Sequence, residues 1–551
     1  MTPTPLRSRS LVRRFSSLAL VASALVIAFG SVTPAAAATA TPTTVTVDPL
    51  PTVQINGIVW RQAIKGNTVY ATGRFSEARP AQGQSGPTVQ RLNLLAYDIR
   101  TGQLNTSFAH TLTGGDNPEG RSIAVSPDGK RLYVGGKFTT VDGQARNNFA
   151  AFDLTTNQLL PGFTGTDSSV LAVAATNSQV FIGGWFSRAG GASRNKLAAY
   201  NADGTLNNSW VANVTGSHVS AMVAMPDKLI VGGSFSKINN ATYYSTGAVK
   251  LTNGSTIKWA SQSSSYRIRM QAPAGKSASA LGITSLSTDG KQVYLTAFTY
   301  LPGVKHPGSF EGRAAISPTD GKLIWANDCA GDSYDAFPIG KVLYSVSHAH
   351  NCSPVGGYKQ QDPPNRALAE TTYKTGKNGK GMGGNYPSFK GVPRGTILSW
   401  FPTMNIGNFS GSNQAAWSVV GTSQYVALGG EFSKVEGVNQ QGLVRFGVRT
   451  VSPHKNGPAP YTKAGVKAAK ANSKRKSKVT ITTTSDRDDS VLTYKVYRGK
   501  EKKPRVVKRV SSRYWKTTTW SFTDTKVKKG KTAKYRVDVY DSAGNKVSTH
   551  N

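Results

Sequence analysis

The chain has 551 residues, with 66 Lys and Arg against 28 Asp and Glu and a formal net charge of +38. Hydrophobic residues make up 38 % and aromatic residues 9 %, which excludes a disordered polymer and leaves enough apolar surface for packed cores. The 57 Gly and 27 Pro favour many short strands and turns over long helices.

The first 38 residues have the pattern of a signal peptide. A basic start containing Arg7, Arg9, Arg13 and Arg14 precedes an apolar run at 18–29 and four alanines at 35–38. The apolar run is shorter than the ~20 residues of a membrane span, which disfavours the alternative of a single anchor. We therefore expect a secreted, extracellular protein without a transmembrane segment in the mature chain, with association to the cell wall as one option.

A Gly-Gly-x-Phe motif recurs along the chain. It occurs as LYVGGKF at 132–138, VFIGGWF at 180–186, LIVGGSF at 229–235 and VALGGEF at 426–432. The first three copies are 48 and 49 residues apart, which is the length of one four-stranded propeller blade. Glycine suits an inner strand where backbones approach closely, and the aromatic residue can pack between neighbouring sheets.

Degenerate copies at 71–75, 291–298 and 341–348 bring the second strands to seven. Six outer strands end on an aromatic residue, namely Phe108, Phe163, Trp210, Trp259, Trp325 and Trp400. The last blade is then one strand short, and the alternating residues 44–47 can complete it. We predict an all-β chain with a seven-bladed propeller over 39–453 whose N-terminal strand closes the last blade. Spacing alone also allows eight blades; we assign the surplus length to insertions at 261–277 and 358–393.

The stretch GGKFTTVDGQARNNFAAFD at 135–153 resembles the delta-60 repeat β-propellers of exported actinobacterial proteins. The resemblance covers roughly residues 50–450. It implies a propeller fold and export, and it carries no general activity.

The C-terminal fifth has a different composition. Residues 454–477 are rich in Pro, Ala, Lys and Ser and predict a basic flexible linker. Residues 478–551 alternate with period two, and YKVYRG at 494–499 and KYRVDVYDSAGN at 534–545 resemble a fibronectin type III module, a small β-sandwich. Its first strand is either 478–483 or lies in the linker.

Half of the net charge lies in this C-terminal region. From residue 455 onward there are 26 Lys and Arg against 7 Asp and Glu. Such a charge favours an anionic cell-wall or extracellular polymer as partner, a glycan being one candidate, although it could also serve only to keep the protein soluble. Tyr514, Trp515 and Trp520 could stack on nucleic acid, but export argues against nucleic acid as the physiological partner. We expect a monomer.

The chain's two cysteines lie in the sixth predicted blade, together with a group of aspartate, tyrosine and histidine residues. In an exported protein, Cys329 and Cys352 predict a disulfide that closes a loop of 23 residues. Around them lie acidic and histidine residues, and His348 and His350 share one face of a strand. The candidate ligand-binding or metal-binding residues are Asp332, Tyr334, Asp335, His348 and His350.

This cluster leaves three interpretations. The side chains could bind a divalent metal or act as acid and base, bind a ligand without catalysis, or only stabilise a loop. We expect no other cofactor and assign no catalytic residue. No GxSxG, HExxH or zinc-type cysteine spacing occurs.

Two functions therefore compete. The first is a non-catalytic binding or adhesion protein of the cell surface or matrix, with the propeller as a platform for carbohydrate or another ligand. The alternative is an extracellular glycan or polymer hydrolase or lyase that uses the sixth-blade cluster. Propellers support both, so fold alone does not separate them.

Overall fold

The computed structural model describes residues 41–270, 281–300, 310–383 and 386–551, and residues 42–551 form one compact unit. The predicted signal peptide, 1–38, lies outside the described residues. The described part consists of β-strands and short 3-10 helices without an α-helix, so the all-β prediction is confirmed. Within these ranges, no helix has the length and apolar character required to cross a membrane.

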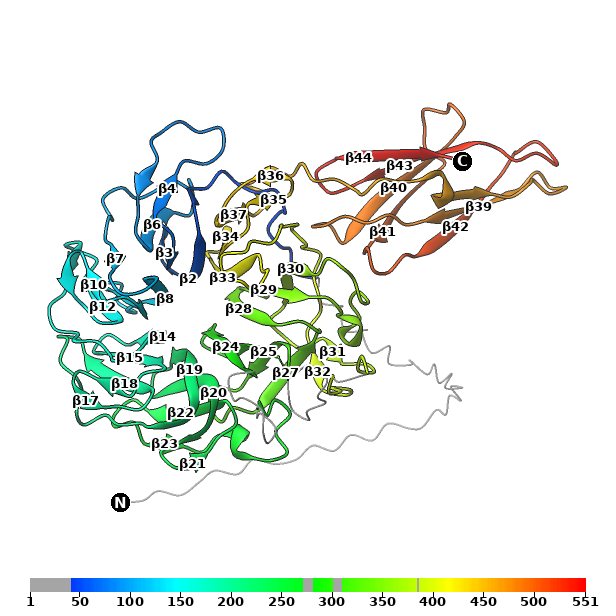
Figure 1. Ribbon diagram of the computed structural model, residues 1–551. Helices are drawn as coiled ribbons and strands as arrows, with labels where there is room; N and C mark the ends of the chain where they lie inside the picture. Colours follow the sequence, from blue (N-terminus) through cyan, green and yellow to red (C-terminus); the bar gives the residue numbers. More distant parts are fainter. Residues whose placement is uncertain (1–40, 271–280, 301–309, 384–385) are drawn as a thin grey trace, which may run out of the picture. The chain divides into compact units, whose positions relative to one another are not determined.

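Among the described residues, seven antiparallel sheets share one pattern, in which the first, second and third strands follow in chain order (Figure 1). Sheet 1 contains β2 (Ile58–Lys65), β3 (Thr68–Arg74) and β6 (Leu94–Asp98), and sheet 2 contains β8 (Glu119–Val125), β9 (Arg131–Lys137), β12 (Phe149–Asp153) and β13 (Gln158–Leu159). Sheet 3 contains β14 (Val170–Ala175), β15 (Gln179–Gly184) and β18 (Leu197–Asn201). Sheet 4 contains β19 (Val214–Ala224), β20 (Lys228–Ile238), β22 (Thr246–Lys250) and β23 (Thr256–Ile257).

The remaining three sheets continue the same order. Sheet 5 contains β24 (Leu281–Thr288), β25 (Val293–Thr299), β26 (Gly312–Ile316) and β27 (Leu323–Asp328). Sheet 6 contains β28 (Ser333–Ile339), β29 (Val342–Ala349) and β30 (Asn365–Thr371), and sheet 7 contains β33 (Ala416–Gly421), β34 (Tyr425–Gly430) and β37 (Leu443–Gly447). Most other strands in this region have two or three residues each. They pair as short hairpins in the connections between the main strands.

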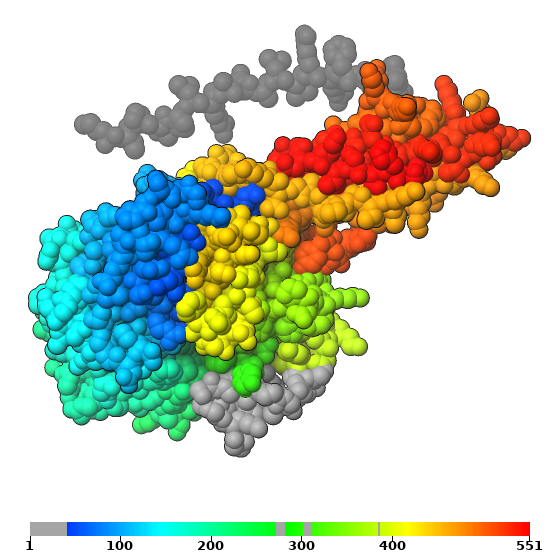
Figure 2. Space-filling view, turned by 45° about the horizontal axis from the view of Figure 1, so that its top comes forward, coloured from blue at the N-terminus to red at the C-terminus, as the bar shows by residue number. Residues whose placement is uncertain are grey.

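The first strands of the sheets follow one another around a common centre (Figure 1). Each contacts the first strand of the next sheet, from β2 through β8, β14, β19, β24 and β28 to β33, and β33 contacts β2. The surface of the first sheet, in blue, accordingly adjoins that of the last sheet, in yellow (Figure 2). Residues far apart in the sequence therefore meet along the inner edges of the sheets.

The two glycines of the repeated motif are required for different reasons. A Cβ atom on Gly183 would lie 2.5 Å from Cγ1 of Val219 in the next sheet. A Cβ atom on Gly184 would lie 2.1 Å from the carbonyl oxygen of Ser169, beside the first strand of the same sheet. The first glycine thus lets neighbouring sheets approach, and the second lets neighbouring strands approach.

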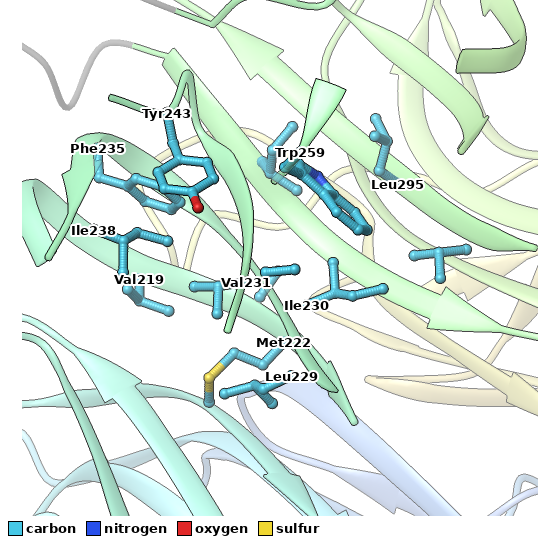
Figure 3. Close-up of a cluster of buried hydrophobic side chains, with 14 of the residues drawn as sticks. Val219, Met222, Leu229, Ile230, Val231, Phe235, Ile238, Tyr243, Trp259 and Leu295 are labelled. Atoms are coloured by element: carbon cyan, nitrogen blue, oxygen red, sulfur yellow. The ribbon is translucent and has the colours of Figure 1, made fainter. Parts of the chain in front are cut away.

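Aromatic residues fill the space between the sheets. The predicted ends of the outer strands are all buried, namely Phe108, Phe163, Trp210, Trp259, Trp325 and Trp400. Between sheets 4 and 5, Val231, Phe235 and Trp259 share a core with Leu295 of β25 (Figure 3).

Sheet 6 differs from the sequence-based expectation. The segment 358–393, predicted as an insertion, contains β30, the third strand of this sheet. Its polar residue Glu370 forms an ion pair with Arg313 of β26, and both side chains are fully buried. The strand was not recognised because this buried pair interrupts the apolar pattern. Of the other predicted insertion, 261–277, residues 271–277 lie outside the described ranges.

The N-terminal segment bonds to the last sheet. The Thr46 amide donates to the Gly447 carbonyl at 2.9 Å, and the Leu50 amide donates to the Arg445 carbonyl at 2.8 Å. The Trp400 indole donates to the Thr46 carbonyl, and Val47 is fully buried in the same core.

The C-terminal region forms two further sheets. One has the order β38 (Val466–Ala468), β39 (Ser477–Thr482), β42 (Thr519–Asp524), and the other β41 (Val506–Ser511), β40 (Val491–Arg498), β43 (Tyr535–Tyr540), β44 (Lys546–His550). Their side chains share one hydrophobic core that includes Ile481, Tyr494 and Val537. Strand β38 lies inside the predicted linker, 454–477, so both segments considered for the first strand form strands.

Candidate functional site

Each of the seven first strands has a β-bulge at the equivalent position. In β2, for example, the register with β3 shifts between Val59 and Arg61, so Trp60 is the extra residue. Bulges re-aim a side chain and are frequent beside functional sites. The seven bulge residues are Trp60, Arg121, Leu171, Ser220, Thr284, Tyr334 and Trp417.

All seven bulge residues line one hollow of about 200 Å³, which we call the channel mouth. Trp185, the variable residue of GGWF, also lines it and is 49 % exposed. The ring-bearing side chains around the hollow are Trp60, Trp185, His218, Phe298, Tyr334 and Trp417. Flat, largely apolar ring surfaces thus make up much of the lining of this hollow.

Three of these rings form a fixed wall. The Trp417 ring lies 4.9 Å from that of Trp60 and 4.4 Å from that of Tyr334, measured between centroids. The Trp60 indole donates to Glu119 at 2.8 Å, and the Trp417 indole donates to Glu431 at 2.9 Å. Because each indole N–H donates a hydrogen bond to a glutamate carboxylate, both indoles keep their orientation.

Charged groups border the wall. The Arg121 guanidinium lies 4.1 Å from the Trp60 ring centroid and pairs with Glu119. The Arg61 guanidinium donates to the carbonyls of Thr284 at 2.7 Å and Trp417 at 3.0 Å. Arg61 therefore satisfies backbone groups that the bulges leave without a strand partner.

Arg61 forms the floor of the mouth. It also lines a second cavity of about 310 Å³, which is bordered by residues from all seven first strands. Burial lowers the pKa of Arg61, and the charge of Asp335 opposes this shift. Arg61 thus lines both hollows.

The predicted residues Tyr334 and Asp335 lie on different sides of this floor. Tyr334 lines the mouth, whereas Asp335 lines the cavity below. The Asp335 carboxylate accepts from the Ser285 hydroxyl at 2.5 Å and the Val419 amide at 3.0 Å. Burial raises its pKa, and Arg61 opposes that effect. Asp335 therefore faces Arg61 rather than the mouth.

The predicted residue His348 stands behind Tyr334. Its Nε2 lies 3.2 Å from the Asp332 amide nitrogen, and its Nδ1 lies 2.8 Å from the Tyr334 hydroxyl and 3.0 Å from Nε2 of Gln414. Burial lowers the pKa of His348 to about 4, which keeps the ring neutral at pH 7. His348 holds the Tyr334 side chain in place.

His350 and Asp332 have other partners. Nδ1 of His350 lies 2.8 Å from Oε1 of Gln360, and the Asp332 carboxylate accepts from the Thr299 amide at 3.2 Å. Within the described part of the chain, neither imidazole hydrogen-bonds to the carboxylate of Asp332 or Asp335. The predicted residues thus lie near one another without forming a histidine–carboxylate pair.

Glu311 is a neighbour that the sequence analysis missed. Its Oε2 accepts from the Gly331 amide at 2.9 Å. Burial, together with the nearby charge of Asp332, raises the pKa of Glu311 to about 8, and burial raises that of Asp332 to about 6. No local pattern marks Glu311, because Asp332 is brought to it only by the fold.

Except for Tyr334, the aromatic residues of the mouth were also missed, but the repeat contained a signal for Trp417 and Trp185. Trp417 and Leu171 each precede the first glycine of their motif by twelve residues, and Trp185 occupies the variable position of the motif. Some positions of a repeat vary from copy to copy while the neighbouring positions stay the same. Such positions are candidates for a binding surface. The predicted Cys329–Cys352 disulfide is confirmed.

Comparison with known proteins supports the propeller. The model of a β-propeller family described as a domain of unknown function (DUF5122) matches residues 177–209, which contain β15 and β18. No curated protein matches the chain. One solved structure with some similarity is that of the computationally designed Ika8 protein, with 10 % identity, 74 % of this chain and 100 % of that chain covered, and a TM-score of 0.38.

Proposed function

We propose that the protein is a secreted, non-catalytic seven-bladed β-propeller that binds a glycan at its channel mouth. The seven sheets with equivalent bulges, and the contact between β33 and β2, support seven blades rather than eight. The hydrogen bonds of Thr46 and Leu50 to the last sheet support closure of that blade by the N-terminal segment. Closure of this kind leaves no free sheet edge.

The convergence of all seven bulge residues on one hollow carries the proposal. A sugar ring has an apolar C–H face that packs on aromatic rings and hydroxyl groups that require polar partners. The Trp60, Tyr334 and Trp417 wall offers the first, and the Arg121 guanidinium offers the second. The volume of about 200 Å³ lies below the roughly 300–1,000 Å³ of larger ligand pockets, which favours one sugar ring.

Trp417→Ala tests this site. We expect the variant to bind its glycan at least about tenfold more weakly, because a central aromatic residue carries a large share of binding free energy. A glycan array would identify the ligand, and calorimetry would compare the two affinities.

Tyr540→Ala, in the C-terminal sheets, is the matched control and should bind like the unaltered protein. Equal affinity of the Trp417 variant would contradict the proposed site.

The alternative of a glycan hydrolase or lyase has one observation in its favour. Glu311, with a pKa of about 8, holds a proton at pH 7 as a general acid must. Release of new sugar ends from the bound glycan would establish this alternative, and intact glycan after prolonged incubation would exclude it for that ligand.

The basic C-terminal region is the proposed contact with an anionic wall or matrix polymer. Its two sheets, of three and four strands around one core, support a fibronectin type III-like sandwich. Lys508 and Arg509 on the edge strand β41 are exposed. By contrast, Trp515 donates to the Gly356 carbonyl at 3.0 Å, so its ring is engaged by a loop of sheet 6.

We expect a Lys508→Glu, Arg509→Glu variant to be released from purified cell wall at lower NaCl than the unaltered protein, because surface charge attraction is screened by salt. The matched control is Lys130→Glu with Lys291→Glu, in exposed turns of sheets 2 and 5. Equal elution of the β41 variant and this control would contradict a specific role of β41.

A further inference from the structure

Acidic side chains gather beyond β39, in a protein with a net charge of +38. One carboxylate oxygen from each of Asp486, Asp488 and Asp489 lies within 4.8 Å of the others. The possible metal-ligand atoms of His454, Asp489 and Asp541 also lie within 4.8 Å of one another. The two groups share Asp489, so the four carboxylates form two adjoining groups.

The carboxylates of Asp488, Asp489 and Asp541 have hydrogen-bond partners. Asp488 accepts from the Val47 amide at 2.9 Å, and Asp489 accepts from the Arg449 guanidinium at 2.9 Å. Asp541 accepts from the amides of its own turn. His454 lies 3.3 Å from Asp488 and from Asp489.

Asp486 differs from these three. Its Oδ1 accepts from the amides of Asp488 and Asp489 at 3.0 and 3.2 Å, but its Oδ2 accepts no hydrogen bond from the described residues. The residue is 4 % exposed, so bulk solvent does not reach this oxygen. Its carboxyl group lies within hydrogen-bonding reach of that of Asp488. Burying a carboxylate oxygen beside another carboxylate is costly unless a positive partner lies between them.

The structure has space for such a partner. Of the three aspartates, Asp486 lines a cavity of about 440 Å³, together with Glu436 and with Arg487, whose guanidinium pairs with Glu436. A cavity of this size holds several water molecules.

We propose that Asp486, Asp488 and Asp489 bind a calcium ion. Ca²⁺ takes six to eight oxygen ligands, and the water molecules of the cavity complete the set that the carboxylates begin. An all-oxygen set favours this hard cation over zinc or copper. The ion stabilises the loop between β39 and β40. Through Asp488 this loop contacts Val47 of the N-terminal segment, and through Asp489 it contacts Arg449, which follows sheet 7. This site is independent of the proposed glycan site.

The test uses the mature, full-length protein after treatment with a chelator. Terbium luminescence excited through the aromatic residues reports binding, and competition with Ca²⁺ gives the affinity. We expect a Kd of roughly 10⁻⁴ to 10⁻³ M, as in extracellular calcium modules. We also expect 10 mM Ca²⁺ to raise Tm by about 2 °C or more, because the ion binds the folded state.

Asp486→Asn keeps the shape of the side chain and removes its charge. We expect at least tenfold weaker terbium binding and loss of the Ca²⁺-dependent rise in Tm. Asp538→Asn, which alters a buried carboxylate of β43 outside the cluster, should leave both unchanged. If Asp486→Asn does not fold, Asp489→Asn must show the same loss.

Two results would overturn the proposal. If the unaltered protein binds no Ca²⁺ and Asp486→Asn has the same Tm, a shared proton satisfies the carboxyl pair instead. If Zn²⁺ binds more tightly than Ca²⁺ and His454→Gln abolishes that binding, the site is a histidine metal site and the calcium assignment is wrong.

Discussion

At the scale of single residues, burial changes the protonation of Glu311. Its pKa is about 8 in the folded protein, against the usual 4.5 of an exposed glutamate. Between these values the unfolded chain loses the proton while the folded chain keeps it, so the free energy of unfolding falls as pH rises. His348, with its pKa lowered to about 4, has the opposite effect below pH 6.5. Between pH 6.5 and 8, the raised pKa values of Asp486 and His454 act in the same direction as that of Glu311, so the contribution of Glu311 is the difference between the protein and its Glu311 variant.

We predict that Glu311→Gln reduces the loss of stability between pH 6.5 and 8, by up to roughly 1.4 kcal/mol per pH unit for one proton. Urea denaturation at several pH values measures this slope. Asp203→Asn, which removes a carboxylate from an exposed turn, should keep the slope of the unaltered protein. An identical slope for Glu311→Gln would show that this side chain does not hold the proton.

At the scale of elements, the glycines of the motif set the distance between sheets. We predict that Gly183→Ala lowers the free energy of unfolding by about 1–3 kcal/mol, because its Cβ would lie 2.5 Å from Val219 of the next sheet. Chemical denaturation measures the change. Gly379→Ala is the control, since the nearest atom to its Cβ would be the Pro354 carbonyl oxygen at 3.5 Å. Equal effects of the two substitutions would contradict the role of close sheet packing.

At the scale of the whole molecule, stability depends on contacts between the ends of the ring of sheets. We predict that Val47→Ala lowers the free energy of unfolding by about 2 kcal/mol, because Val47 is fully buried against the core of sheet 7. We expect a single unfolding transition at lower temperature, measured by calorimetry, since each sheet contacts the next. Val507→Ala, at a 55 % exposed position, should change stability by less than about 0.5 kcal/mol. A small separate transition would instead mean that the N-terminal segment around Val47 detaches alone.

The sequence by itself determined the repeating strands, the close-packed glycines, the buried aromatic ends and the Cys329–Cys352 disulfide. These features depend on neighbours within one repeat, or on the pairing of the chain's two cysteines, so a local pattern carries them. The sequence also identified Tyr334 as a candidate site residue, but it did not identify the residues that lie around Tyr334.

The tertiary structure alone decided the rest. The channel mouth takes one residue from each of seven strands spread over some 360 residues of sequence, and a bulge has no sequence pattern of its own. Strand β30 remained hidden because Glu370 is compensated by Arg313 from another sheet. The acidic cluster around Asp486 combines residues from the C-terminal sheets with Val47 and Arg449. In each case, a polar or aromatic side chain acquires its role from a distant partner, which only the tertiary arrangement of the sheets supplies.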